Sequence, residues 1–135
     1  MSDTMVSQLH GLRVMVAEDD YLISQMIERV LHELGCVVVG PFRKLGEALH
    51  AITTTDLDGA LLDVQLGAKN VSPVATELAL RDIPFILVTG QRNMIGSSAP
   101  LGNAPLLTKP FTIRRLEEVM HSTFRLGKRC EPQQL

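Results

Sequence analysis

Hydrophobic residues along the chain are concentrated in five short runs, and each run is followed by a segment with a helical or turn-like pattern. Within a run the apolar residues are continuous rather than alternating, which is typical of parallel strands covered on both faces. We therefore predict five buried strands, over residues 12–17, 37–40, 59–63, 85–89 and 105–108.

Most intervals between these runs carry apolar residues at helical spacing, which indicates amphipathic helices. Asp20 is expected to cap the first helix, and Gly35 is its expected stop. Ser72 is expected to cap a later helix in which Pro73 is the first helical residue, and Thr112 to cap the last one.

The interval after the fourth run has a different composition. Residues 91–104, QRNMIGSSAPLGNA, contain glycines, serines and a proline where another strand–helix unit would place a full helix. Each of these residues weakens a helix interior. We therefore expect a short, frayed or absent helix there, within a mobile loop.

Strands that alternate with helices in this way predict an α/β fold with right-handed crossovers. The simplest arrangement is a flavodoxin-like, doubly wound sheet of five parallel strands in the order 2-1-3-4-5, with a short or disordered fourth helix. The chain of 135 residues is long enough for one domain. We place that domain at residues 11–126, between a flexible lead-in at 1–10 and a C-terminal tail at 127–135.

Composition and charge narrow the function classes. The net charge of −2 gives no global basic field that would attract nucleic acid or anionic lipid, and no apolar run is long enough to cross a membrane. Two cysteines are too few for a disulfide scaffold and fit a reducing compartment. We therefore expect a cytoplasmic protein whose partners include neither nucleic acid nor a membrane.

Chemically active side chains stand at the carboxyl ends of four of the predicted strands, where doubly wound sheets bind their ligands. These side chains are Glu18 and Asp19 after the first strand, Asp63 at the end of the third, Thr89 at the end of the fourth and Lys109 after the fifth. The carboxyl ends of parallel strands meet at one edge of a sheet. We therefore expect three carboxylates, a hydroxyl and an ammonium group to converge on one crevice.

The adjacent carboxylates Glu18, Asp19 and Asp20 repel one another, and partial burial increases the repulsion. They must be paired with a cation, protonated or bound to a metal. A flavin or nucleotide phosphate would be repelled here, because such ligands favour glycines and bare amides after the first strand. Carboxylates hold Mg²⁺, which shares its remaining positions with water and phosphate oxygens. We therefore predict a Mg²⁺ site that recruits a phosphoryl group, with Asp20 an N-cap rather than a direct ligand.

Four motifs in this order and spacing, VMVAEDD, ALLDV, LVTG and LTKPF, resemble the receiver domain of response regulators. The resemblance runs from about Leu12 to Phe124. It implies a stand-alone receiver of a two-component or phosphorelay pathway, which is a signalling protein rather than an enzyme. It also implies that Asp63 accepts a phosphoryl group from a histidine kinase or a histidine phosphotransfer protein, and that an unknown downstream protein reads this state.

The resemblance also implies a role for each residue at the strand ends. The implied Mg²⁺ ligands are Glu18, Asp19, Asp63 and the backbone carbonyl of Gln65. The hydroxyl of Thr89 would follow the phosphoryl group, and the ammonium group of Lys109 would bind its oxygens. The Lys109–Pro110 bond is a candidate cis peptide, which receivers usually have. These roles agree with elementary chemistry, because a carboxylate can form an acyl phosphate and phosphoryl transfer depends on positioning and electrostatics.

The chain departs from most receivers on the fifth strand, where Leu106 stands in place of the usual aromatic residue. It partly matches the FATGUY subgroup of single-domain receivers, which often lack that aromatic and tend to have a mobile region after the fourth strand. We hypothesise that phosphorylation orders residues 91–104 through Thr89 and Gly90, in place of an aromatic rotation.

Two other functions stay open. The loss of the aromatic at Leu106 slightly favours a receiver-like interaction module that acts without phosphorylation. The retained site residues argue against this module, and they are Glu18, Asp19, Asp63, Thr89 and Lys109. A Mg²⁺-dependent phosphohydrolase would use Asp63 as its nucleophile and a second carboxylate two residues later as general acid. Gln65 occupies that position, and its amide cannot donate the required proton.

A kinase-facing surface is expected on the first helix, because the helix begins beside the acidic crevice. The residues expected to form this surface lie off the buried stripe and are Tyr21, Leu22, Gln25, Met26 and Arg29.

Overall fold

The computed structural model describes residues 9–90, 102 and 104–124. The predicted lead-in at 1–10 and the glycine-rich stretch at 91–104 fall largely outside these residues, and the predicted tail at 127–135 falls wholly outside them. The short fourth helix and the ordering of residues 91–104 by phosphorylation therefore stay predictions.

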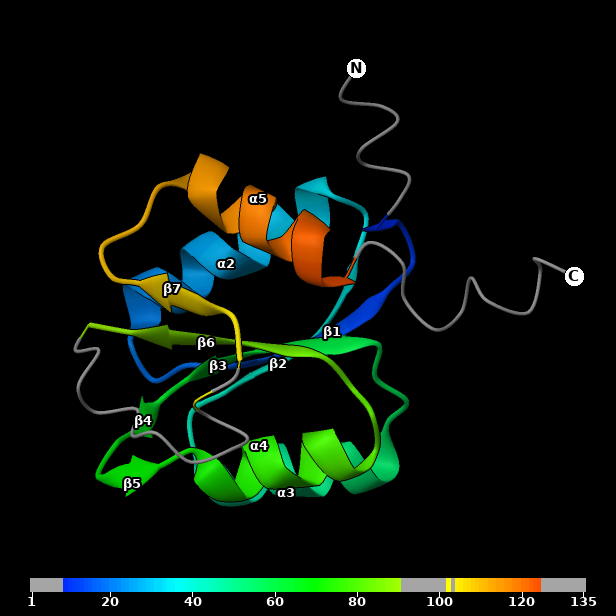
Figure 1. Ribbon diagram of the computed structural model, residues 1–135, viewed down its shortest axis with the longest axis vertical. Coiled ribbons are helices and arrows are strands. Elements are labelled where there is room, and N and C mark those ends of the chain that lie inside the picture. The colour runs from blue at the N-terminus through cyan, green and yellow to red at the C-terminus, as the bar shows by residue number, and fades with distance from the viewer. Residues whose placement is uncertain (1–8, 91–101, 103, 125–135) are drawn as a thin grey trace, which may run out of the picture.

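A five-stranded parallel sheet forms the centre of the fold (Figure 1). Its strands are β1 (Arg13–Ala17), β2 (Val37–Phe42), β3 (Gly59–Asp63), β6 (Phe85–Thr89) and β7 (Leu106–Thr108). They lie in the order β2-β1-β3-β6-β7, which is the predicted order 2-1-3-4-5. The prediction of a flavodoxin-like, doubly wound sheet is confirmed.

Helices cover both faces of the sheet. In the described residues these helices are α2 (Tyr21–Glu33), α3 (Leu45–Thr54), α4 (Ser72–Leu80) and α5 (Ile113–Phe124). Figure 1 shows α2 and α5 on one face and α3 and α4 on the other. Within the described part of the chain, no helix is both long enough and apolar enough to span a bilayer.

Strand β1 shows why the apolar runs are continuous. Val14 and Val16 belong to the core cluster that contains residues of α2 and α5, whereas Met15 and Ala17 belong to the cluster on the side of α3 and α4. All four side chains are fully buried. Successive side chains of a strand point to opposite faces, so a strand covered on both faces must be apolar at every position.

Two predicted helix caps are confirmed. The side chain of Asp20 accepts a hydrogen bond of 3.2 Å from the amide of Ile23 at the start of α2. The hydroxyl of Thr112 accepts one of 3.0 Å from the amide of Arg115 at the start of α5. Gly35, the predicted stop of α2, follows the last turn with a φ of +83°.

The prediction that Ser72 caps the third of these helices is wrong. Helix α4 begins at Ser72 itself, and Val71 stands at the N-cap position. The side-chain oxygen of Asn70 accepts a hydrogen bond of 2.8 Å from the amide of Ser72 and another from its hydroxyl. The serine hydroxyl therefore donates to the side chain of Asn70 and does not cap the helix. Pro73 lies in the first turn, where its missing amide hydrogen costs nothing.

A short hairpin directly after β3 was not predicted. It consists of β4 (Gln65–Leu66) and β5 (Lys69–Asn70), which pair antiparallel. Gly67 begins the connecting turn with a φ of +61°, a conformation that glycine adopts without steric cost. The side chain of Leu66 is buried in the core cluster of α3 and α4, which anchors the hairpin to the domain.

Strand β2 extends beyond its predicted end to Phe42, through a cis Gly40–Pro41 bond. Gly40 has a φ of +109°, and a Cβ atom there would lie 2.9 Å from the carbonyl oxygen of Val16. Only glycine fits this close approach of the two strands. The carbonyl of Phe42 then accepts a hydrogen bond of 2.9 Å from the amide of Glu18, which brings the end of β2 beside the predicted site.

Candidate functional site

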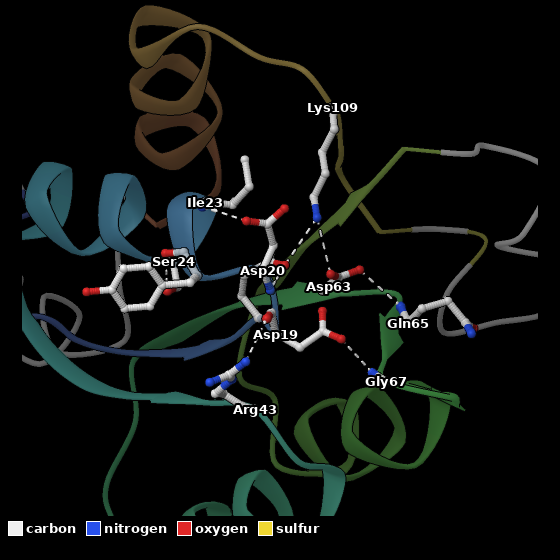
Figure 2. A network of polar contacts seen from close by, with 11 residues as sticks. Asp19, Asp20, Ile23, Ser24, Arg43, Asp63, Gln65, Gly67 and Lys109 are labelled. Atoms are coloured by element: carbon white, nitrogen blue, oxygen red, sulfur yellow. Dashed lines mark hydrogen bonds and ion pairs between the residues drawn. The ribbon is translucent and has the colours of Figure 1, made fainter.

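The carboxyl ends of β1, β3, β6 and β7 meet at one edge of the sheet. The pairs of neighbouring residues nearest this edge are Ala17 with Leu62, Asp63 with Val88, and Thr89 with Thr108. In Figure 2 the side chains of Asp19, Asp63 and Lys109 come together from three of these strand ends.

Three carboxylates form the centre of the site. Oxygen atoms of Glu18, Asp19 and Asp63 lie within 4.8 Å of one another, as the strand ends predicted. Glu18 is only 1% exposed and Asp63 7%, whereas Asp19 is half-buried at the rim. The cluster is therefore open to solvent on the side of Asp19.

Lys109 supplies the opposite charge. Its Nζ atom lies 3.1 Å from Oε2 of Glu18 and 3.2 Å from Oδ2 of Asp63. Burial works against the charged form of this lysine, but the charges of Glu18 and Asp63 and its hydrogen bonds to them outweigh that penalty. The pKa of Lys109 is therefore raised above its ordinary value, and the side chain is a cation at neutral pH.

The single ammonium group of Lys109 cannot balance the charge of three carboxylates. The pKa of Glu18 is also raised. Burial is the main cause that raises the pKa of Glu18 from 4.5 to about 8, followed by its hydrogen bond to Asp63 and the charge of Asp63. Its Oε1 atom is buried and has no hydrogen-bond partner. A buried acceptor without a donor, beside two further carboxylates, is a donor set that fits a hard divalent cation.

The β4–β5 hairpin holds Asp19 from the outer side. The amide of Gly67 donates a hydrogen bond of 2.8 Å to Oδ2 of Asp19, and the other carboxylate oxygen points toward the middle of the site (Figure 2). The guanidinium of Arg43 lies 3.4 Å from the backbone carbonyl of Asp19. Neither Gly67 nor Arg43 was predicted as part of the site, although a glycine within a short polar stretch after a strand is a known hairpin signal.

Both oxygens of Asp63 have partners. Oδ1 accepts a hydrogen bond of 3.1 Å from the amide of Gln65, and Oδ2 faces the ammonium group of Lys109. Gln65 therefore contacts Asp63 through its amide, while the predicted role of its carbonyl as a metal ligand stays a prediction.

The third adjacent carboxylate, Asp20, points away to α2, where its side chain caps the helix. Its amide donates a hydrogen bond of 3.0 Å to Oε2 of Glu18. The interpretation of Asp20 as an N-cap rather than a direct ligand agrees with this arrangement.

Thr89 ends β6 and is 5% exposed. Its carbonyl accepts a hydrogen bond of 2.8 Å from the amide of Lys109, so the backbone links the threonine to the lysine. The Lys109–Pro110 bond is cis, as expected. Leu106 begins the neighbouring strand β7 and is half-buried, packed on the core cluster of α3 and α4.

The predicted kinase-facing surface of α2 is largely exposed. Tyr21 is 63% exposed and Leu22 76%, which is high for apolar side chains of this size. Gln25 and Arg29 are also exposed, and Met26 is half-buried. The helix begins directly after the three adjacent carboxylates, so its first turn lies beside the site.

The chain is similar to known proteins in sequence and in fold. A family model described as the response regulator receiver domain matches residues 14–121. The transcriptional regulatory protein PdtaR of Mycobacterium tuberculosis is 30% identical over 110 residues, which cover 77% of this chain and 52% of PdtaR. The chain spans about half the length of the curated relatives that it matches.

Solved structures of response regulators have a similar fold. The response regulator PhyR from Brucella abortus has a TM-score of 0.77 and 27% identity, covering 91% of this chain and 51% of PhyR. The solution structure of SdrG from Sphingomonas melonis Fr1 has a TM-score of 0.73 and 33% identity, covering 83% of this chain and 95% of SdrG. The narrower resemblance to the FATGUY subgroup stays a prediction.

Proposed function

Because the chain belongs to the family of response regulator receiver domains, we propose that Asp63 accepts a phosphoryl group from a histidine kinase or a histidine phosphotransfer protein. The observation that carries this proposal is the position of Asp63, which lies within 4.8 Å of two other carboxylates and 3.2 Å from the ammonium group of Lys109. A nucleophile placed among metal-binding groups and a cation suits transfer of an anionic group.

The proposed reaction is a direct displacement at phosphorus. An oxygen of Asp63 attacks the phosphorus atom of a phosphohistidine and forms a new oxygen–phosphorus bond. The phosphorus–nitrogen bond breaks, and its electron pair leaves with the imidazole. That imidazole is protonated on its other ring nitrogen, so it departs as neutral histidine. The product on this chain is an acyl phosphate.

Lys109 and Thr89 serve the transferred group in this proposal. The ammonium group of Lys109 neutralises charge on the phosphoryl oxygens as the group approaches Asp63. Thr89 stands at the end of the adjacent strand β6, and its hydroxyl is proposed to follow the phosphoryl group after transfer. Release of Lys109 from Glu18 and Asp63 toward the phosphoryl oxygens is the local change that a partner protein would detect.

Glu18, Asp19 and Asp63 are the side chains proposed to hold Mg²⁺, together with the carbonyl of Gln65. The unpartnered Oε1 atom of Glu18 supports this assignment, because it is a buried acceptor that needs a cation or a proton. When bound, the ion neutralises the carboxylates and the incoming phosphoryl oxygens. These carboxylates and the Gln65 carbonyl would bind and orient the ion.

The output is proposed to be a contact with a downstream protein or onward transfer of the phosphoryl group, without enzymatic turnover of a metabolite. The low net charge supports protein partners rather than nucleic acid, and the sparse cysteines support a cytoplasmic location. PdtaR is named as a transcriptional regulator, but this chain matches about half of it. The proposal therefore rests on the receiver site alone.

The test is the mass of the intact protein after incubation with Mg²⁺ and acetyl phosphate. We expect one added phosphoryl group on the wild type, and none when EDTA replaces Mg²⁺ or in Asp63→Asn. Asp82→Asn is the matched control, because Asp82 is an exposed aspartate with a φ of +57°, which asparagine also tolerates. This variant should be labelled like the wild type.

The absence of an adduct, under conditions that label a control receiver, would contradict the proposal and favour an interaction module that acts without phosphorylation. Labelling of Asp63→Asn to the wild-type level would place the phosphoryl group on another residue. Continuous release of phosphate from a small ester would instead indicate a phosphohydrolase.

A further inference from the structure

A groove beside the carboxylate cluster separates the start of α3 from the β4–β5 hairpin. Its volume is about 700 Å³. Leu45, Leu66 and Ala68 give it apolar surface, and Asp19 stands at its side. Asp19 also belongs to the carboxylate cluster, so one side of the groove is formed by a residue whose carboxylate lies within 4.8 Å of that of Asp63.

Three cations line this groove. Arg43 and Lys44 stand on the wall that leads into α3, and Lys69 stands on β5 in the opposite wall. All three are exposed. Glu47 is the acidic residue of the α3 wall, and its carboxylate accepts a hydrogen bond of 3.4 Å from the amide of Arg43.

The three groove cations differ from most others in the described residues because none of them forms an ion pair. The lysines and arginines with carboxylate partners are Arg29, Arg81, Lys109, Arg114 and Arg115. Arg13 is the remaining described cation without an ion pair, and its guanidinium donates to a backbone carbonyl. Positive charge without a carboxylate partner is therefore concentrated around this groove, where the Arg43 guanidinium has the backbone carbonyl of Asp19 as its partner.

The shape of the groove favours a protein segment over a small anion. Its cations stand on two separate walls with apolar surface between them, so they do not converge on one point. A volume of about 700 Å³ also exceeds what a phosphate or acetyl group fills. An occupant with carboxylates on both sides of apolar side chains would match the charge and the surface together.

We propose that this groove is a docking site for an acidic segment of a partner protein that also carries apolar side chains. The inference rests on the proposed function in one respect, because it assumes that the partner is a signalling protein that acts at Asp63. Arg43, Lys44 and Lys69 bind the carboxylates of the segment, and Leu45 and Leu66 contact its apolar side chains. Binding there places the partner beside the phosphoacceptor without using the exposed face of α2.

The test uses a short synthetic peptide of alternating glutamate and leucine, titrated into ¹⁵N-labelled protein. We expect saturable shifts of the amide signals of Leu45, Gly67, Ala68 and Lys69, and weaker binding at higher salt concentration. The double variant Lys44→Glu/Lys69→Glu should lower the affinity by about fivefold or more. Arg114→Glu is the matched control, since Arg114 is an exposed cation on α5 and should leave the affinity within about twofold.

A lysine–leucine peptide and sodium sulfate complete the test. Equal shifts with the lysine–leucine peptide, or no shifts with the glutamate–leucine peptide, would overturn the inference. Saturation of the same amides by sulfate with equal affinity would make the groove a small-anion site and would also overturn it. Labelling by acetyl phosphate is measured on the same double variant. Labelling at the wild-type level with lost peptide binding separates this inference from the proposed function.

Discussion

The backbone amide of Gly67 lies 2.8 Å from Oδ2 of Asp19, a hydrogen bond between residues that are 48 positions apart. It joins the tip of the β4–β5 hairpin to the carboxylate cluster. Because this amide holds one oxygen of Asp19, the other oxygen is presented to the middle of the site (Figure 2). Hydrogen bonds from the surrounding backbone to metal-binding side chains orient those side chains and tune the affinity of the site for the metal.

Changing Gly67 tests that relationship. Gly67→Val places a β-branched side chain at a φ of +61°, where it is strained, so the turn should shift and release Asp19. We expect the affinity for Mg²⁺, measured by calorimetry, to fall about tenfold. Gly67→Asn should stay close to the wild type, because asparagine tolerates this conformation. Equal affinities in all three proteins would show that the hairpin does not position Asp19.

Removing the charge of Lys109 should have opposite effects on two measurements. Lys109→Met should slow labelling by acetyl phosphate by about 100-fold or more, because nothing then neutralises the phosphoryl oxygens on that side. The same variant should bind Mg²⁺ about threefold more tightly or better, since a cation beside the metal ligands is gone. Lys44→Met is the control for the loss of an exposed lysine and should change neither quantity. Weaker Mg²⁺ binding in Lys109→Met would contradict this account.

Glu18 predicts a dependence of stability on pH when Mg²⁺ is removed with EDTA. The folded protein keeps a proton on Glu18 up to a pKa of about 8, whereas the unfolded chain releases it near 4.5. Between these values the folded state binds more protons, so the free energy of unfolding falls as the pH rises. Relative to Glu18→Gln, we expect a loss of about 2–4 kcal/mol across this window in urea titrations. A constant difference between the two proteins would refute the raised pKa, and Mg²⁺ at the upper end should restore stability.

The packing of Gly59 against Phe124 predicts a steric limit in the core. A Cβ atom at Gly59 would lie 2.6 Å from Cε1 of the Phe124 ring, which is fully buried in α5. Gly59→Ala should therefore lower the free energy of unfolding by about 1–3 kcal/mol. Gly46→Ala is the matched control, because a Cβ there meets nothing within 4 Å and the helix should gain about 0.5–1 kcal/mol.

A double variant separates this contact from a general loss of packing. In Gly59→Ala/Phe124→Leu the smaller side chain removes the clash, so the total loss should be smaller than the sum of the two single losses. Strictly additive losses would show that the alanine is accommodated elsewhere in the core.

The sheet and the convergence of the site residues were predictable because both follow from local patterns. Strands β3 and β6 have the predicted bounds, since their apolar runs are continuous. Glu18 and Asp63 were expected to meet because the carboxyl ends of neighbouring parallel strands lie side by side.

The features that escaped prediction depend on contacts between distant segments or on very short elements. The β4–β5 strands have two residues each, too few to show a period, and only Gly67 marks their turn. Ser72 fits the sequence rule for an N-cap, but its hydroxyl donates to the side chain of Asn70 instead. The link between Gly67 and Asp19 joins residues with no pattern in common, so the sequence carries no local signal for it.

The two oxygens of Asp63 face different donors, and this makes the carboxylate chemically asymmetric. Oδ1 receives the rigid backbone amide of Gln65, whereas Oδ2 receives the long and flexible side chain of Lys109. In an acyl phosphate one of these oxygens becomes the bridge to phosphorus and the other stays a carbonyl. The side chain of Lys109 can move with the phosphoryl group more readily than the backbone amide of Gln65 can. Oδ2 is thus the expected bridging atom, and the fold sets the orientation of the mixed anhydride before any donor arrives.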